Sequence, residues 1–201
     1  PPALHGHGFD GHPHVAYLGL PFAGFPHADG HLRALAVAIP GLDRAERRRI
    51  LRGILGTDPD RIVDLQVPGF RRVFGLRYSP DEPLPASATA ARWTRPARSW
   101  VSVTPLVLDR YPKKGDLAPA VVRSIQQAGF PAPVTVELST QPLTPGAAHL
   151  TPKELPLRAR GRLYRHVRMT FEHPVTGPVL AGAGRYFGVG LFAPEREGAD
   201  R

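Results

Sequence analysis

The sequence predicts an α+β protein in which two modules are built on antiparallel sheets. Each half of the 201-residue chain shows a strand pattern, then an amphipathic helix pattern, then further strand patterns. A proline-rich stretch separates the two halves. This repeated order is typical of tandem ferredoxin-like (RRM-like) modules, although no residue-level repeat is visible. We therefore predict a first module at 1–79, a connector at 80–98 and a second module at 99–201.

The first module contains strands that are predicted from apolar runs and from alternation. Residues 15–22 and 32–39 carry almost no charge, and the polar segment 25–31 between them is expected to form a loop. Residues 63–67 and 70–78 alternate apolar with polar side chains, which is the period of a half-buried strand. Strands are therefore expected on both sides of a helix.

That helix is indicated by its two ends. Asp43, followed three residues later by Glu46, resembles a capping box, and Gly56 supplies a stop signal. One face carries apolar residues at helical spacing: Ile50, Leu51, Ile54 and Leu55. The outer face is basic and carries Arg44, Arg47, Arg48 and Arg52.

The second module repeats the pattern after an irregular connector. We expect a strand at 100–108 and a helix at 117–128 that ends at Gly129. A further strand is expected at 134–139. A long proline-rich insertion then precedes a third strand at 158–168. The helix and strands again follow in the order that a ferredoxin-like module requires.

The charge of the chain favours a polyanionic partner. Lys and Arg total 26 against 17 Asp and Glu, which leaves a formal net charge of +9. Cationic side chains that neutralise phosphates release bound counterions, so nucleic acid is the first partner to consider. The alternative is that the surplus only keeps the protein soluble.

The composition also excludes several classes of site. The chain has no cysteine, so disulfides, thiolate zinc sites and cysteine nucleophiles are ruled out. No apolar run approaches the roughly 20 residues of a membrane helix, and the start does not resemble a signal peptide. We expect a soluble, cytoplasmic protein with no membrane partner. Because the sequence begins without Met, we also expect it to be a fragment of a longer chain.

The most informative local pattern is a period-two repeat in the third predicted strand. Every second residue there is cationic, titratable or aromatic: Arg158, Arg160, Arg162, Tyr164, His166 and Arg168. If the strand runs unbroken through Gly161, these side chains share one face. Such a ladder would track a phosphate backbone, with Tyr164 stacked on a base. An ordinary solvated strand face is the alternative.

A glycine-rich run near the C-terminus is the second feature. Gly182, Gly184, Gly188 and Gly190 surround Arg185 and Tyr186. Glycines allow positive φ and close backbone approach, so main-chain N–H groups there would meet phosphates, assisted by the arginine and the tyrosine. The run matches neither a nucleotide P-loop nor a dinucleotide fingerprint. A glycine-kinked hairpin without function would produce a similar string.

This glycine run, placed just before the C-terminus, resembles the glycine-rich loop of the RAMP superfamily, which packs paired ferredoxin-like folds. Three segments, 26–30, 100–110 and 184–192, are similar to the fused Cas-five/Cas-six subunit of type I-U (also called I-G) CRISPR systems. The resemblance covers the Cas-six-like half, which is nearly the whole of this chain. It implies a metal-independent endoribonuclease with no cofactor that cuts CRISPR repeat RNA.

Several further expectations come from this resemblance. The partners would be precursor and mature CRISPR RNA and other effector-complex subunits, including a Cas-five-like half. Cleavage would use the ribose 2′-hydroxyl as nucleophile, with a histidine as general acid or base. The first choice for this histidine is His27 in the predicted loop, the second is His31, and the third is His166 on the ladder. The alternative for each of the three is that it is a surface or structural histidine without a catalytic role.

Two weaker features complete the set of candidate sites. Arg110, Lys113 and Lys114 lie in a predicted turn with Tyr111, where they would grip the phosphates of a hairpin stem or form a solvated turn. Near the N-terminus the residues that could chelate a metal are His5, His7, Asp10, His12 and His14, but their glycine-rich surroundings offer no rigid geometry, so no metal site is predicted.

Three functional hypotheses follow from the sequence. The first is a repeat-RNA endoribonuclease, and the second is a non-catalytic RNA-binding scaffold within a CRISPR effector complex. The third is a general RNA-binding or metal-dependent protein with no relation to CRISPR. The resemblance favours the first.

Overall fold

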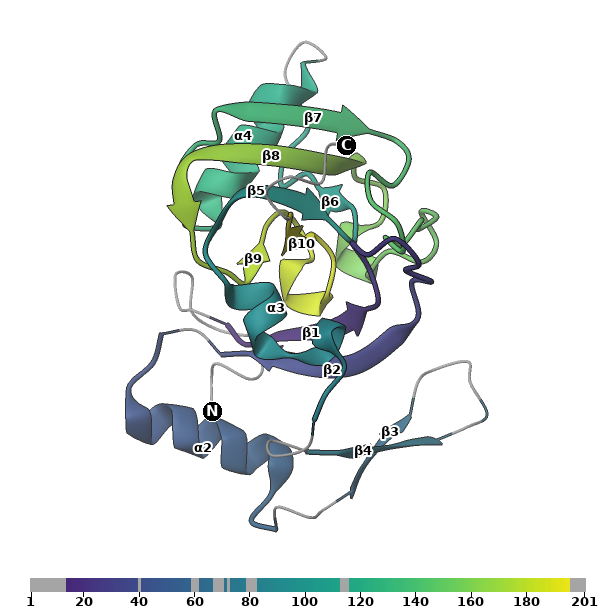
Figure 1. Ribbon diagram of the computed structural model, residues 1–201, viewed down its shortest axis with the longest axis vertical. Coiled ribbons are helices and arrows are strands. Elements are labelled where there is room, and N and C mark those ends of the chain that lie inside the picture. The colour runs from purple at the N-terminus through teal and green to yellow at the C-terminus, as the bar shows by residue number, and fades with distance from the viewer. Residues whose placement is uncertain are drawn as a thin grey trace. The chain divides into compact units, whose positions relative to one another are not determined.

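The chain divides into two units in the computed structural model (Figure 1). One unit combines Pro1–Val15 with Ile39–Pro83, and the other combines Ala16–Ala38 with Leu84–Arg201. Residues of the predicted first module therefore occur in both units. The structure describes residues 14–39, 41–58, 62–66, 71, 73–78, 83–112 and 116–195.

One antiparallel sheet organises the unit that contains Leu84–Arg201. Its strands are β5 (Ala97–Ser102), β6 (Leu106–Val107), β7 (Thr135–Ser139), β8 (Tyr164–Val175), β9 (Val179–Leu180) and β10 (Leu191–Pro194). They lie in the order β6-β8-β5-β10-β9, and β7 also pairs with β8. Figure 1 shows the long strand β8 between β7 and β5.

The four longest of these strands have a ferredoxin-like order. Along the chain they run β5, β7, β8, β10, and in space they lie β7, β8, β5, β10, antiparallel at each step. Helix α4 (Leu117–Gln127) precedes β7, as the first helix of that fold does. Between β8 and β10 the chain forms β9 and the short turn η4 (Arg185–Phe187) in place of a second helix. The predicted α+β class with antiparallel sheets is confirmed.

Helix α4 covers one face of this sheet. Asp116 caps its N-terminus by accepting a hydrogen bond from the Ala118 N–H at 3.2 Å. The apolar face of the helix contributes Val121 and Ile125 to a cluster in which Trp100 is also fully buried. Burial of each such side chain contributes about 1.5–3 kcal/mol, so this cluster fixes the sheet beneath the helix.

The hairpin of β1 (Ala16–Pro21) and β2 (Leu32–Ala38) packs against β10 in a second cluster. Leu18 from β1 and Leu191 from β10 are both buried there. Phe192, the next residue of β10, belongs to the α4 cluster instead. Because successive strand residues point to opposite faces, β10 contributes to the core on both sides of the sheet.

The segment predicted as an irregular connector contains regular structure. It forms the turn η1 (Ala86–Ala88) and helix α3 (Ala90–Thr94) before β5 begins. Trp93 is only 3% exposed and packs in the second cluster, and its Nε1–H donates to the Ser87 carbonyl oxygen at 2.8 Å. The segment is more ordered than its prolines predict, because this tryptophan anchors it in the core.

The other unit contains α2 (Arg44–Leu55), which confirms the predicted helix. The Asp43 carboxylate accepts a hydrogen bond from the Glu46 N–H at 2.8 Å, as the capping-box pattern predicts. Gly56 ends the helix with a φ of 77°, where a side chain would be strained. Ile50 is fully buried, so the apolar face is the one that the sequence indicates.

A two-stranded hairpin follows α2 in the same unit. Strands β3 (Ile62–Gln66) and β4 (Val73–Arg77) pair antiparallel, with Val63 opposite Leu76. Strand β4 lies within the predicted range 70–78, and β3 begins and ends one residue before the predicted range 63–67. Within the described part of this unit the hairpin forms a sheet of its own.

The helices of the described residues are short. Helix α2 has 12 residues and α4 has 11. A helix that spans a bilayer needs about 20 apolar residues. Among the described residues there is accordingly no helix with the length and apolarity to cross a membrane.

Candidate nucleic-acid interface

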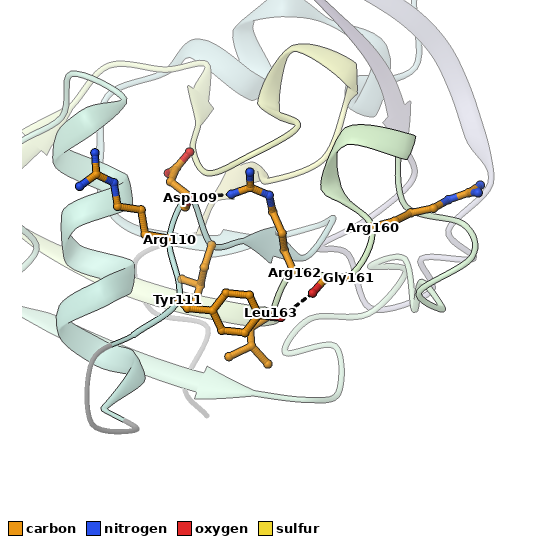
Figure 2. A pocket seen from close by; sticks show the side chains of 8 residues that line it. Asp109, Arg110, Tyr111, Arg160, Gly161, Arg162 and Leu163 are labelled. Carbon is orange, nitrogen blue, oxygen red and sulfur yellow. Dashed lines mark hydrogen bonds between the residues drawn. The ribbon is translucent and has the colours of Figure 1, made fainter.

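Two segments that are distant in the sequence converge to form a surface cleft. The cleft has a volume of about 490 Å³ and is lined by Leu108, Asp109, Arg110, Tyr111, Arg160, Gly161, Arg162 and Leu163. We refer to it as the basic cleft, because three of its residues are arginines. Figure 2 shows Arg110 and Arg160 on opposite sides of the cleft, with Arg162 between them.

Backbone pairing brings the two segments together. Strand β6 pairs with the beginning of β8, and just beyond this pairing the Leu108 N–H donates to the Leu163 carbonyl oxygen at 2.8 Å. The Tyr111 hydroxyl donates to the Gly161 carbonyl oxygen (Figure 2). The side chain of Tyr111 is nevertheless 67% exposed, so most of its ring faces solvent.

The predicted cationic ladder is wrong at its N-terminal half. Strand β8 begins at Tyr164, and the preceding residues form the turn η3 (Leu157–Ala159) and a bend. Gly161 adopts a φ of +76°, which interrupts an extended strand. The Ala159 N–H also donates to the Pro156 carbonyl oxygen at 2.7 Å, which closes the turn. The arginines of this part are Arg158, Arg160 and Arg162, and they therefore do not share one strand face with His166 and Arg168.

Two of these arginines still line the basic cleft, although Figure 2 shows the Arg160 side chain extending away from Arg162, and each donates to a backbone carbonyl oxygen. Arg160 donates from Nη2 to the Lys153 oxygen at 2.7 Å, and Arg162 donates from Nη1 to the Asp109 oxygen. A guanidinium has five N–H donors, so both side chains retain donors for a ligand. Arg158 is exposed but does not line the cleft.

The single carboxylate of the cleft is partly neutralised. Asp109 Oδ1 lies 3.8 Å from Arg185 Nη1, in an ion pair that is largely shielded from solvent. Arg185 also stacks over the Tyr186 ring at 4.6 Å and donates to the Tyr186 hydroxyl at 3.1 Å. Arg185 and Tyr186 do not line the cleft, but Arg185 contacts Asp109, which does. With Asp109 paired in this way, the lining of the cleft keeps a net positive charge.

The side chains in the C-terminal half of the predicted ladder are engaged in contacts within the fold. Arg168 forms ion pairs with Glu137 at 2.7 Å and Glu195 at 3.0 Å. Burial disfavours its charged form, but these two carboxylates outweigh burial and raise the pKa of Arg168. Tyr164 is half-buried and packs against Leu155 in a third apolar cluster. Both side chains therefore have structural contacts that compete with RNA.

The glycine-rich run forms the predicted loop, and its glycines are required by close backbone packing. A Cβ at Gly182 would collide with the Val107 carbonyl oxygen, and a Cβ at Gly190 would collide with that of Ala181. Gly184 and Gly188 flank η4 with φ values of 90° and 79°.

The main-chain N–H groups of this loop are in part already used. The Ala183 N–H donates to the Val107 oxygen at 2.8 Å, and the Phe187 N–H donates to the Gly184 oxygen at 2.8 Å. These bonds support the alternative of a packed hairpin, which holds β6 and the adjacent cleft segment in place. Phosphate binding by the loop stays a prediction.

His166 is buried, unlike the other two candidate histidines. His166 is only 2% exposed, and its Nδ1 lies 3.2 Å from the Ser102 hydroxyl oxygen. Burial lowers the pKa of His166, and hydrogen bonds with the backbone of Ser102 and Ala148 oppose that shift only partly. The imidazole is therefore neutral near pH 7 and has almost no surface that an RNA could touch.

His31 lies in an exposed cluster of three side chains. Its Nδ1 is 3.1 Å from Asp29 Oδ2, and Arg33 Nη2 is 2.6 Å from the same oxygen. The His31 N–H also donates to Asp29 Oδ1 at 2.9 Å, and this bond is the main reason that the pKa of Asp29 is lowered. The side chain of His31 is 78% exposed, while a carboxylate orients its ring. We call these three residues the histidine cluster.

Sequence reasoning named His31 but missed the other two members of this cluster. Asp29, His31 and Arg33 recur at a spacing of two, but Gly30 between them adopts a φ of +74°, so the segment is not a continuous strand. The hydrogen bond from the His31 N–H to Asp29 and the ion pairs of Asp29, rather than the spacing, bring them together. His27 is exposed in the same loop, four residues earlier.

The loop that carries the histidine cluster is held by a second loop of the same unit. The Gly24 N–H donates to the Pro145 carbonyl oxygen at 2.9 Å. A Cβ at Gly146 would collide with the Phe22 carbonyl oxygen, so the two backbones pack without room for a side chain. The loop is therefore held by these distant contacts as well as by its own hydrogen bonds, such as that from the Gly30 N–H to the Phe22 carbonyl oxygen at 3.0 Å.

A second hollow of about 240 Å³ lies between this loop and α3, and is lined in part by Phe25, Arg92 and Arg95. Sequence reasoning missed it. Arg92 donates to the Pro194 carbonyl oxygen at 2.8 Å, and Arg95 donates to that of Glu195 at 2.9 Å. These bonds attach α3 to the end of β10, so the hollow has a structural explanation.

Some predicted site residues lie outside the described residues. These are Lys113 and Lys114 of the basic turn and the N-terminal His5, His7, Asp10 and His12. Within the described residues no group of three His, Asp or Glu side chains is arranged to hold a metal ion.

Comparison with known families decides the broad context of these sites. A family model described as CRISPR-associated protein, GSU0054 family, matches residues 81–194, which is more than half of the chain. The chain belongs to this CRISPR-associated family. No match was found among curated proteins or among solved structures.

For this CRISPR-associated protein, the matched region contains both segments of the basic cleft and the glycine-rich loop. The histidine cluster and α2 precede the matched region. Family membership excludes the hypothesis of a protein with no relation to CRISPR. It does not distinguish a ribonuclease from a scaffold.

Proposed function

We propose that this CRISPR-associated protein binds CRISPR repeat RNA in the basic cleft and cleaves it by a metal-independent reaction. The observation that carries the proposal is the convergence of residues 108–111 and 160–163 into one cationic, partly aromatic cleft. The cleft lies wholly within the region that matches the family. An RNA partner would find suitable chemistry on this surface, because the cleft combines arginines with an exposed tyrosine.

The lining of the cleft suits an RNA backbone. Arginine forks bind phosphate oxygens in pairs, and the hydrogen bond from Arg162 to the Asp109 carbonyl oxygen orients its guanidinium. The exposed ring of Tyr111 can stack on an unpaired base, and stacking contributes about 1–3 kcal/mol per base. The cleft would therefore hold a nucleotide with its phosphate at the arginines and its base at the tyrosine.

The histidine cluster has suitable groups for the cleavage step. His31 accepts the proton of a ribose 2′-hydroxyl, and the 2′ oxygen attacks the adjacent phosphorus. The bond from phosphorus to the 5′ oxygen breaks, which leaves a 2′,3′-cyclic phosphate and a 5′-hydroxyl once the leaving oxygen is protonated. Asp29 orients the imidazole, and the Arg33 guanidinium beside it is proposed to offset negative charge on the phosphate oxygens.

This geometry changes the order of the candidate histidines. His31 has an orienting carboxylate, whereas no such partner is found for His27 among the described residues. His166 is buried and is proposed to position β5 against β8 through Ser102 rather than to touch RNA. We therefore propose His31 as the catalytic residue and keep His27 as the second choice.

The more specific identity is also a proposal. The resemblance of three segments to the fused Cas-five/Cas-six subunit of type I-U (I-G) systems supports a Cas-six-like half that processes precursor CRISPR RNA. The partners proposed on this basis are mature CRISPR RNA and other effector-complex subunits, with a Cas-five-like half among them.

One observation favours a second candidate, a non-catalytic RNA-binding scaffold. Among the described residues that line the basic cleft there is no histidine. RNA bound there is held without a general base in the same cleft, which is sufficient for a scaffold.

An assay with labelled repeat RNA in EDTA separates the two candidates. A single cut that leaves a 2′,3′-cyclic phosphate is expected, and replacement of His31 by alanine should abolish the cut while RNA binding is retained. Tight binding without any cut would identify a scaffold and withdraw the catalytic role of His31. Cleavage that requires a divalent metal would contradict the proposed reaction.

A further inference from the structure

Helix α2 presents an unusual density of exposed arginines outside the basic cleft. Five of its twelve residues are exposed arginines: Arg44, Arg47, Arg48, Arg49 and Arg52. Arg44, Arg48 and Arg52 are four residues apart and lie in one row along the helix. At 1.5 Å per residue the row is about 12 Å long. We call these three residues the α2 arginine row.

This row works against the stability of its own helix. Like charges four residues apart repel each other, and the row contains two such pairs. Arg44 also lies in the first helical turn, where the positive end of the helix dipole disfavours a cation, whereas the dipole favours Arg52 in the last turn. None of the ion pairs found among the described residues includes an α2 arginine. The charges therefore have no stabilising partner within the described part of the chain.

The arginines are also not needed for the packing of α2. The buried side is provided by Ile50, which is fully buried, and by Leu51, Ile54 and Leu55, which are partly buried. The helix is capped by Asp43 rather than by any arginine. A set of residues that costs stability and does not pack is a candidate for binding an external ligand.

We propose that the α2 arginine row is a second RNA-binding surface, which contacts the phosphate backbone of a base-paired stem. The identification of the ligand as RNA rests on the proposed function. The repulsion between cations in a row is relieved when phosphates lie between them, because the ligand supplies the missing opposite charge.

The composition of α2 favours a duplex over a single strand. The helix, RAERRRILRGIL, has no aromatic residue, so it offers no platform on which an unpaired base can stack. In a paired stem the bases are stacked within the helix and a deep, narrow major groove hides their edges, so phosphates are what the protein meets. The basic cleft, by contrast, has the exposed ring of Tyr111. The two surfaces are thus suited to different parts of one hairpin.

A charge-matched pair of variants tests this proposal. Arg48→Gln/Arg52→Gln removes two charges from the row, and Arg98→Gln/Arg123→Gln removes two charges from exposed positions elsewhere. Glutamine has nearly the helix propensity of arginine, so circular dichroism should show an unchanged helix. Binding to the repeat hairpin, and to a single-stranded RNA of the same length, is measured by fluorescence anisotropy over a series of salt concentrations.

The α2 variant should bind the hairpin at least about tenfold more weakly, and its slope of log K against log salt should fall by about 2. Its binding to the single strand should be unchanged, and the control variant should bind both RNAs like the wild type. Equal losses for the two variants, or an equal loss on both RNAs, would overturn the proposal.

An Arg110→Gln variant distinguishes failure of this inference from failure of the proposed function. If that variant binds RNA more weakly while the α2 variant binds normally, the cleft stands and the α2 arginine row is not an RNA surface. If the wild type binds neither RNA, both proposals are wrong.

Discussion

Arg162 and Arg168 are six residues apart, yet the fold gives them different surroundings. Arg162 lines an open cleft and donates to one backbone carbonyl group. Arg168 is held between Glu137 and Glu195 and donates to the Leu143 carbonyl oxygen as well. The same contrast separates the two kinds of candidate histidine, since one is exposed in a loop and the other is buried in the sheet. A cation with carboxylate partners supports the fold, and one without them is available to a ligand.

The largest expected effect concerns the exposed histidine. His31→Ala should lower the cleavage rate by roughly 10²–10⁴, because the general base is lost, while stability is unchanged. Single-turnover cleavage of repeat RNA measures this rate. His173→Ala is the matched control, because His173 is also exposed but lies at the far end of β8. Normal cleavage by the His31 variant, together with loss in His27→Ala, would transfer the catalytic role to His27.

The next effect tests whether Arg168 supports the fold. Arg168→Ala leaves two carboxylates without their partner and should lower the free energy of unfolding by about 1–2 kcal/mol, a value reduced for partial solvent screening. Urea denaturation measures the change. Arg162→Ala is the control and should cost less than about 0.5 kcal/mol. Equal destabilisation by the two changes would remove the distinction between them.

The reverse pattern is expected for RNA binding. Arg162→Gln should weaken binding about three- to tenfold and reduce the slope of log K against log salt by about 1, because one phosphate contact is lost. Arg168→Gln should leave the slope unchanged, since its charge is already paired within the fold. A salt titration of both variants decides the point, and a larger change for Arg168 would show that the ladder face does contact RNA.

The smallest effect is a pH dependence that depends on His166. Burial lowers the pKa of His166, so the unfolded chain binds a proton more readily than the folded one. Stability from the neutral imidazole is therefore complete above the unfolded pKa of about 6.5 and is lost as the pH falls below it, by up to about 1.4 kcal/mol per pH unit.

Thermal unfolding between pH 7.5 and pH 5 measures this dependence, with His166→Gln as the reference that cannot titrate. The wild type should lose more stability than the variant as the pH falls. Parallel curves for the two proteins would show that the burial of His166 does not affect its protonation.

Prediction from the sequence succeeded where the signal was local. The cap at Asp43 and the stop at Gly56 were readable, because each depends on residues close together in the chain. The ladder failed where two local preferences competed. The alternation of residues 158–168 indicated a strand, but Pro156 and Gly161 close a turn through that stretch.

Three features of this protein were determined by the sequence alone: a basic net charge, an α+β fold with antiparallel sheets, and a glycine-rich run near the C-terminus. Only the tertiary structure decided which of the described arginines have carboxylate partners and which do not. It joined residues 108–111 to residues 160–163 across the β6–β8 pairing, and it placed Glu137 and Glu195 beside Arg168. Charge and periodicity are properties of neighbours in the chain, whereas burial and ion pairing depend on contacts between residues far apart in it.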